Sequence, residues 1–164
     1  MGVVLALIGM GFAMPGERSI VRTRTITASA ADIQAKLIEL KTWPEWSAWN
    51  LERDPSATWT FDGEAGEPGH SWRWQGDQLG DGTLVLTDVH VANGGIAYDL
   101  TFADTPTSVG SVTLREVDGV TAVVWTNGLD MGSNPIMRLI GPFVEAMVGA
   151  DFEVGLDGLA AALE

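Results

Sequence analysis

The chain has 164 residues, of which 46% are hydrophobic and 19% charged, and its formal net charge is −13. This length and composition predict one globular domain with a real core, and they exclude a disordered chain. The acidic balance, without any basic stripe, excludes nucleic acid as a partner, and the absence of cysteine excludes disulfides and thiolate chemistry.

The first 16 residues form a segment separate from the domain that follows at 17–164. Residues 3–14 carry no charge, and Pro15-Gly16 ends a helix and serves as a linker. A helix over the first 14 residues spans about 21 Å, which is short of the roughly 30 Å of bilayer hydrocarbon. We therefore predict a short N-terminal apolar helix that anchors the protein to a membrane, either by thinning the bilayer or by docking on integral membrane proteins. A retained signal-like segment and a helix packed on the domain's own core are the alternatives.

Three arginines follow this segment at positions 18, 22 and 24. By the positive-inside rule they favour a cytoplasmic position for the main domain. The alternative is that Arg22 and Arg24 belong to the first strand, which would make their role structural.

The domain begins with a predicted strand over 19–28 and a helix over 29–40, which Ser29 caps with Asp32 three residues later. The segment "TWPEWSAWN" (42–50) follows, with Pro44 in the first turn of a short helix. Its three tryptophans, Trp43, Trp46 and Trp49, are expected to hold the two short helices on the sheet. Contact with a ligand is the alternative role.

Six further strands are predicted, most of them joined by tight turns such as "NGG" (93–95) and Asp118-Gly119. One long amphipathic helix follows from Ser133-Asn134 to the end of the chain, with Pro135 at its start. The strands are predicted at 57–63, 70–76, 83–91, 96–102, 109–117 and 120–128. This order predicts an α+β fold, in which a curved antiparallel sheet of six to seven strands wraps around the C-terminal helix.

The order and several local motifs resemble the START/birch-pollen-allergen (SRPBCC) superfamily, in particular its bacterial polyketide cyclase/dehydrase-like lipid-binding group. The resemblance covers residues 17–164 and is carried by four stretches: "ITASAADIQAKLIELKTWPEWSAWN", "GHSWRWQG", "VTAVVWTNG" and "DFEVGLDGLAAAL". It implies the helix-grip fold and a cavity for a hydrophobic small molecule or lipid under the long helix. Because only some members are enzymes and they share no catalytic motif, the resemblance implies a fold more firmly than an activity.

Eight apolar residues are candidates for the lining of such a cavity. Aromatic residues on strands would form its floor, and one stripe of the long helix would form its roof. The candidates are Trp72, Trp74, Tyr98, Trp125, Met137, Ile140, Val144 and Met147. An ordinary filled core without a usable cavity is the alternative.

No convergent set of polar residues indicates catalysis, a metal site or a cofactor. His90 and Asp88 are expected on the strand face of Leu84 and Leu86, and as residues i and i+2 they are expected to point at solvent together. His70 and His90 fit no metal-ligand spacing, and no dinucleotide or phosphate-binding motif occurs. We therefore expect no catalytic residue, no metal and no cofactor.

Three functions remain open from the sequence. The first is a membrane-associated binding module for a hydrophobic small molecule or lipid. The second is a non-catalytic accessory subunit of a larger membrane protein complex. The third is an enzyme of the polyketide cyclase/dehydratase type, in which replacing His90 or Tyr98 would abolish turnover.

Overall fold

A computed structural model describes residues 10, 12–91, 93–103 and 105–164 of the chain. The predicted N-terminal apolar helix falls mostly outside these described residues, of which Met10, Phe12 and Ala13 are helical. Within the described part of the chain, no helix has the length and apolar character needed to span a bilayer.

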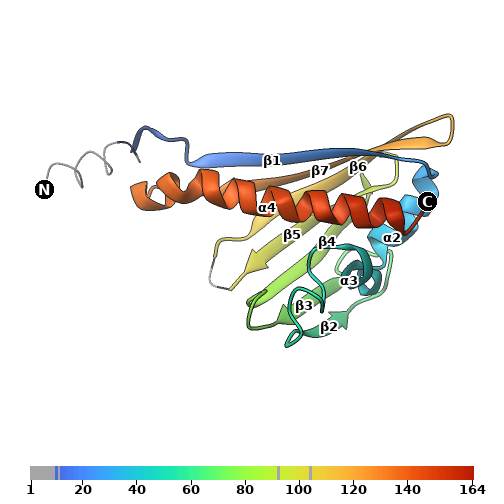
Figure 1. The fold of residues 1–164 in the computed structure, drawn as a ribbon, viewed down its shortest axis with the longest axis horizontal. Coiled ribbons are helices and arrows are strands. Elements are labelled where there is room, and N and C mark those ends of the chain that lie inside the picture. Colours follow the sequence, from blue (N-terminus) through green and yellow to red (C-terminus); the bar gives the residue numbers. More distant parts are fainter. Residues whose placement is uncertain (1–9, 11, 92, 104) are drawn as a thin grey trace, which may run out of the picture.

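The predicted α+β fold is confirmed, with seven antiparallel strands in the order β1-β7-β6-β5-β4-β3-β2 (Figure 1). Two tight turns join neighbouring strands, at Asn93-Gly94 and at Asp118-Gly119, and all four residues have positive φ, as the predicted hairpin turns require. The strands are β1 (Glu17–Ile26), β2 (Thr58–Asp62), β3 (Ser71–Gln75), β4 (Gly82–Val91), β5 (Gly95–Phe102), β6 (Ser108–Val117) and β7 (Val120–Asp130).

One prediction about strand faces is wrong. The pairing of β4 with β5 shifts register after Leu86 and again after Asp88, so a bulge interrupts the alternation. Leu84 and Leu86 are buried, but beyond the bulge it is Val89 that is buried. Asp88 and His90 are therefore exposed on the opposite side from Leu84, and their predicted orientation toward solvent is confirmed.

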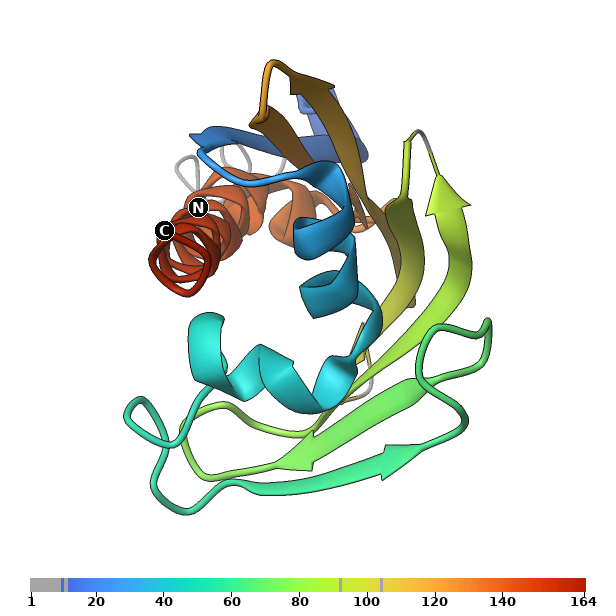
Figure 2. The same cartoon turned by 90° about the vertical axis from the view of Figure 1, so that its right-hand side faces the viewer.

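Three short elements close one end of the curved sheet (Figure 2). They are α2 (Ala30–Ile38), the 3₁₀ turn η1 (Leu40–Thr42) and α3 (Trp43–Trp46). The side chain of Ser29 caps α2 by accepting a hydrogen bond from Asp32 N at 3.2 Å, as predicted. The buried His70 ties η1 to the sheet, because its Nε2 accepts from Leu40 N at 3.3 Å and its Nδ1 lies 3.0 Å from the carbonyl oxygen of Asp62.

The long helix α4 (Pro135–Ala161) runs beside β1 (Figure 1), and its first turn is capped by the side chain of Asn134. Ion pairs join its length to β1: Arg18 pairs with Glu145 at 3.0 Å, Arg22 with Glu153 at 2.5 Å, and Arg24 with Asp157. Gly141 and Gly149 of α4 face the guanidinium groups of Arg18 and Arg22, and the absence of side chains there lets the arginines lie across the helix.

The core between α4 and the sheet is filled mainly by aromatic rings. The ring of Trp125 on β7 stacks on Phe152 of α4, with ring centroids 4.3 Å apart. Two further rings fit because each lies beside a glycine of the neighbouring strand. A Cβ at Gly82 would overlap the ring of Trp74, and a Cβ at Gly110 would overlap the ring of Tyr98. The aromatic core therefore depends on missing side chains as much as on large ones.

Candidate functional site

The four strand aromatics predicted as a cavity floor all lie on the inner face of the sheet. Trp72, Trp74, Tyr98 and Trp125 are buried, with at most 2% of each side chain exposed. The indole of Trp125 donates a hydrogen bond to the Tyr98 hydroxyl at 2.8 Å. Burial raises the pKa of Tyr98 far above its usual value, and the Trp125 bond offsets this only in part, so the phenol stays protonated.

The space above this floor is occupied by the three tryptophans of the 42–50 segment. Trp43 packs against Tyr98 and Trp125, and Trp49 stacks on Trp74 with ring centroids 5.7 Å apart. Trp46 also contacts Trp125, at 6.0 Å between centroids. The packing role predicted for these tryptophans is confirmed. A ligand would reach the floor only if this segment moved.

The four helix residues predicted as a cavity roof lie in the first half of α4. They belong to a longer apolar stripe on one side of this half-helix, which consists of Ile136, Met137, Ile140, Phe143, Val144 and Met147. The exposed fraction is 40% for Met137, 43% for Ile140 and 47% for Met147, while Val144 is half-buried. The aromatic core lies under the second half of α4 and leaves this stripe uncovered.

The stripe has two edges that face different directions. Met137 and Val144 form the inner edge, in line with Val148, which packs against the core one turn further on. Ile136 and Phe143 form the outer edge and are exposed by 61% and 71%. The inner edge therefore adjoins the buried core, whereas the outer edge points away from it.

Two buried polar atoms other than indole nitrogens have no hydrogen-bond partner among the described residues. One is Oδ1 of Asn127 on β7, and the other is Nε of Arg18 on β1. Asn127 pairs in the β1–β7 register with Ile20, two residues from Arg18. Sequence reasoning missed Asn127. The signal was available, because an asparagine stands at an inward position of the strand "VTAVVWTNG".

Three indole N–H groups of the core, in Trp46, Trp72 and Trp74, also find no acceptor among the described residues. Buried N–H groups are normally satisfied, because leaving one unpaired costs about 1–3 kcal/mol. Among the buried side-chain atoms without a partner, donors therefore outnumber the one acceptor, Asn127 Oδ1. A molecule carrying an acceptor oxygen would find unused partners here.

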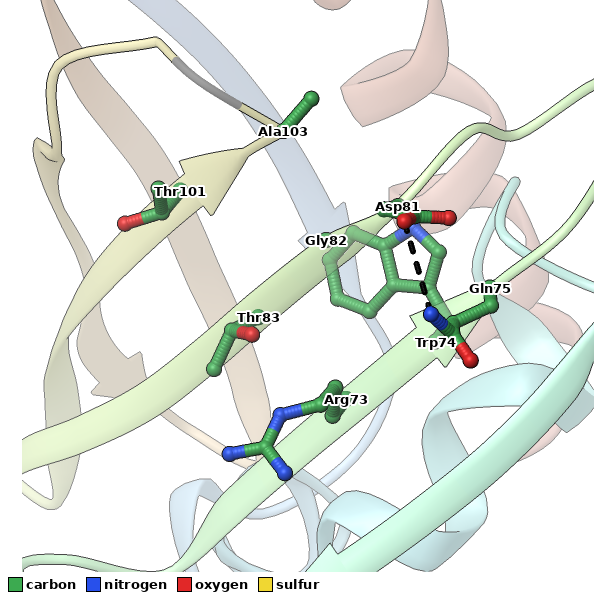
Figure 3. Close-up of a pocket in the computed structure, with 8 residues that line it drawn as sticks. All are labelled: Arg73, Trp74, Gln75, Asp81, Gly82, Thr83, Thr101 and Ala103. Atoms are coloured by element: carbon green, nitrogen blue, oxygen red, sulfur yellow. Dashed lines mark hydrogen bonds between the residues drawn. The ribbon is translucent and has the colours of Figure 1, made fainter.

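Two surface pockets formed by the described residues lie away from the space between α4 and the core. The first, of about 320 Å³, lies at β3, β4 and β5 and includes Arg73, Trp74, Thr83, Thr101 and a Gln75–Asp81 hydrogen bond of 3.4 Å (Figure 3). The second, of about 590 Å³, includes Pro15, Asp130 and Arg138. Polar groups dominate both pockets, so neither has the apolar lining expected for a hydrophobic ligand.

The described residues contain no group of three histidine, aspartate or glutamate side chains that could hold a metal ion. Asp88 and His90 are both exposed on β4. The side-chain oxygen Oδ1 of Asp88 accepts a hydrogen bond from the backbone N–H of His90 at 2.8 Å. His70, in contrast, is buried and uses both ring nitrogens to hold neighbouring segments. The arrangement of these groups does not bring an acid and a base to one apolar site.

The seven-stranded antiparallel sheet and the long C-terminal helix define the helix-grip class of proteins. Residues 17–164 match the model of a family described as polyketide cyclase/dehydrase and lipid transport. The chain belongs to this family, and with it to the START/birch-pollen-allergen superfamily that the sequence resembles. No curated protein gives a significant match.

Solved structures of low sequence identity share the fold. A hypothetical protein from Helicobacter pylori superposes with a TM-score of 0.66 at 8% identity, over 90% of this chain and 88% of that one. A protein from Thermobifida fusca gives 0.60 at 22% identity, over 87% and 90%. Ara h 8.0201 gives 0.57 at 11% identity, over 89% and 99%. At these identities the likeness concerns the fold alone.

Proposed function

We propose that the protein is a membrane-associated binding module for a hydrophobic small molecule or lipid. The observation that carries the proposal is the uncovered apolar stripe in the first half of α4, in a chain whose family includes lipid transport. Apolar side chains in such number are seldom left exposed without a partner. Membrane association through residues 3–14 is part of this proposal, and it rests on the uncharged sequence of that segment.

The ligand lies against the inner edge of the stripe, where Met137 and Val144 adjoin the core. Ile140 and Met147 flank it, and the buried Trp72, Trp74, Tyr98 and Trp125 come into contact only if Trp43, Trp46 and Trp49 shift. The unpaired Oδ1 of Asn127 and the unpaired indole N–H groups support a ligand that carries at least one hydroxyl or carbonyl group on an apolar body.

A titration with the neutral fluorescent probe N-phenyl-1-naphthylamine tests the proposal. The double variant Met137→Gln/Val144→Gln should bind the probe about tenfold more weakly, because two apolar contacts are lost. Val109→Gln is the matched control, since Val109 is exposed on β6, and it should bind like the original chain. Equal affinity of all three proteins, or no binding by any of them, would contradict the proposal.

The accessory-subunit and cyclase/dehydratase hypotheses remain as alternatives. No specific contact among the described residues favours docking on a larger complex. The enzyme alternative lacks an acid–base pair at an apolar site, because His90 is exposed on the outside of β4 and Tyr98 is buried as a protonated phenol.

A further inference from the structure

The outer edge of the α4 stripe stands in an uncharged part of the molecule. Among residues 131–150, only Arg138 and Glu145 carry charge. Both are turned away from the stripe: Glu145 pairs with Arg18 on β1, and Arg138 donates hydrogen bonds to the carbonyl oxygens of Gly132 and Met14. The exposed side of this half-helix is therefore apolar without interruption.

The N-terminal segment leaves the domain beside this same half-helix. Met131 N donates to the carbonyl oxygen of Gly16 at 2.7 Å, and Arg138 Nη1 donates to that of Met14 at 3.3 Å. Met10 and Phe12, the apolar residues described just before this point, are exposed by 54% and 61%. The nine residues that precede Met10 in the sequence carry no charged side chain.

We propose that this end of the molecule docks on a lipid bilayer, with Ile136 and Phe143 of α4 inserted beside Met10 and Phe12. We call these four residues the docking face. A first segment of 14 residues reaches only about 21 Å as a helix, which is short of the roughly 30 Å of bilayer hydrocarbon. The inference rests on the membrane association in the proposed function and extends it from the N-terminal segment to the folded domain.

Two other occupants of the docking face are less favourable. One would leave apolar surface exposed, and the other would bring like charges together. If residues 1–9 folded back on α4, their own outward side would still be apolar, because the segment has no polar side. A second copy of the chain would bring together two molecules that each carry a net charge of −13, which opposes association. A bilayer covers both the segment and the helix at once.

Docking in this orientation places the ligand stripe at the membrane. Met137 and Val144 lie on the inner edge of the same half-helix whose outer edge enters the lipid. A lipid or other apolar molecule could then pass from the bilayer to the inner edge without crossing water. The acidic remainder of the domain faces away from the lipid headgroups.

The absence of cysteine from the chain allows a direct test with single labels. The full chain carrying Phe143→Cys is labelled with a nitrobenzoxadiazole fluorophore and mixed with phosphatidylcholine vesicles. We expect the emission to shift to shorter wavelength, as the label leaves water. The matched label at Val109→Cys, which is 63% exposed on β6, should not shift.

Vesicle flotation complements the labels. The double variant Ile136→Gln/Phe143→Gln should partition into phosphatidylcholine vesicles about tenfold more weakly than the original chain. Adding phosphatidylglycerol should weaken binding of the original chain, since the domain carries net negative charge. This dependence is the reverse of that expected from a basic peripheral protein.

Three outcomes would overturn the inference. If the chain floats with vesicles but the label at position 143 does not shift, the N-terminal segment alone binds lipid and the proposed membrane association survives. If the chain does not float at all, both fail. If the label shifts without vesicles and light scattering gives a dimer, a second copy covers the docking face.

Discussion

Asn127 carries a buried polar atom that the folded chain leaves unpaired, and this makes it the residue most informative about the ligand. Its Nδ2 donates to the carbonyl oxygen of Gly128 at 3.1 Å, while Oδ1 accepts nothing from the described residues. An unpaired buried acceptor lowers stability unless water or a ligand satisfies it. A ligand hydroxyl near this atom would recover that loss on binding.

Replacing Asn127 should therefore separate binding from stability. Asn127→Leu keeps a similar volume and removes the unpaired acceptor, so its melting temperature should stay equal or rise. We expect the original chain to bind 1-naphthol about three- to tenfold more tightly than naphthalene, which is the value of one hydrogen bond, and the variant to lose that preference. Parallel fluorescence titrations measure both ligands, and a preference that persists in Asn127→Leu would refute the role of this residue.

Asp54 is a second buried polar residue, but its partners satisfy it. Its carboxylate accepts hydrogen bonds from the Ser56 hydroxyl at 2.6 Å and from the backbone N–H groups of Leu79 at 2.8 Å and Gln78 at 2.7 Å. These bonds, led by that of Ser56, lower the pKa of Asp54 from 3.8 to about 2 despite the opposing effect of burial. The residue joins the loop before β2 to the turn between β3 and β4.

The depressed pKa gives Asp54 a stabilising role above about pH 4 that is lost as the pH falls from about 4 toward 2, where the folded-state carboxylate becomes protonated. Asp54→Asn should lower the melting temperature at pH 7 and flatten its dependence on pH in that window. Thermal unfolding followed by circular dichroism measures this. An unchanged slope between pH 4 and pH 2 would show that Asp54 does not contribute.

At the level of residues, the sequence predicted only part of the candidate site. Aromatic residues on alternating positions identified the inner face of the sheet, and helical periodicity identified the stripe of Met137, Ile140, Val144 and Met147 as one face. Periodicity cannot say what lies opposite a face. In the fold, the strand aromatics meet Trp43, Trp46 and Trp49, whereas Met137, Ile140 and Met147 of the helix stripe are largely exposed among the described residues. Ligand contact by all eight residues stays a prediction.

At the level of elements, the attachment of α4 differs between its two halves. The second half packs Phe152, Leu156 and Leu159 into the core. The first half is attached by the Arg18–Glu145 pair, by the close approach of Arg18 to Gly141, and by the hydrogen bonds of Arg138 to Gly132 and Met14. Ion pairs that are partly exposed contribute little stability each, so the second half holds the helix in place.

Two glycines in the second half of α4 test how closely that half is held. A Cβ at Gly158 would overlap the carbonyl oxygen of Trp46 in α3, which is backbone and cannot turn aside. Gly158→Ala should therefore destabilise the protein by about 1–3 kcal/mol through overpacking. The atoms nearest to a Cβ at Gly149 belong to the guanidinium of Arg22, which can move, and the better helix propensity of alanine gains up to about 1 kcal/mol.

Urea unfolding measures both variants, with the same slope expected for each. We expect a lower midpoint for Gly158→Ala and a midpoint for Gly149→Ala that is unchanged or higher. The reverse order would mean that the second half of α4 is not held closely against α3.

The elements themselves were largely predictable because local signals agree with the tertiary fold. Two helices begin where the sequence indicates, α2 after Ser29 and α4 after Asn134. The predicted turn at Asn93-Gly94 likewise separates β4 from β5. The bulge in β4 was not predictable, because no glycine or proline marks it and its cause is the pairing with β5. Its consequence is functional, since it turns His90 outward and removes it from any site beneath α4.

On the scale of the whole molecule, charge and apolar surface are separated. The first half of α4 and the preceding N-terminal segment are nearly uncharged, while the remainder carries most of the net charge of −13. This separation is what the proposed docking of one end on apolar partners requires. The helix-grip fold makes such a separation possible because one long helix extends beyond the ends of β4 and β5 (Figure 1).

The central claim is that a hydrophobic molecule binds against the inner edge of the first half of α4. NMR of the full chain, labelled with 15N and at the methyl groups of methionine, isoleucine, valine and threonine, tests it most directly during a titration with 1-naphthol. We predict that the largest shifts occur at Met137, Ile140, Val144 and Met147, with the side-chain amide of Asn127 shifting along with them. Shifts confined to the pocket around Thr83 and Thr101, or no shifts at saturating ligand, would contradict the account.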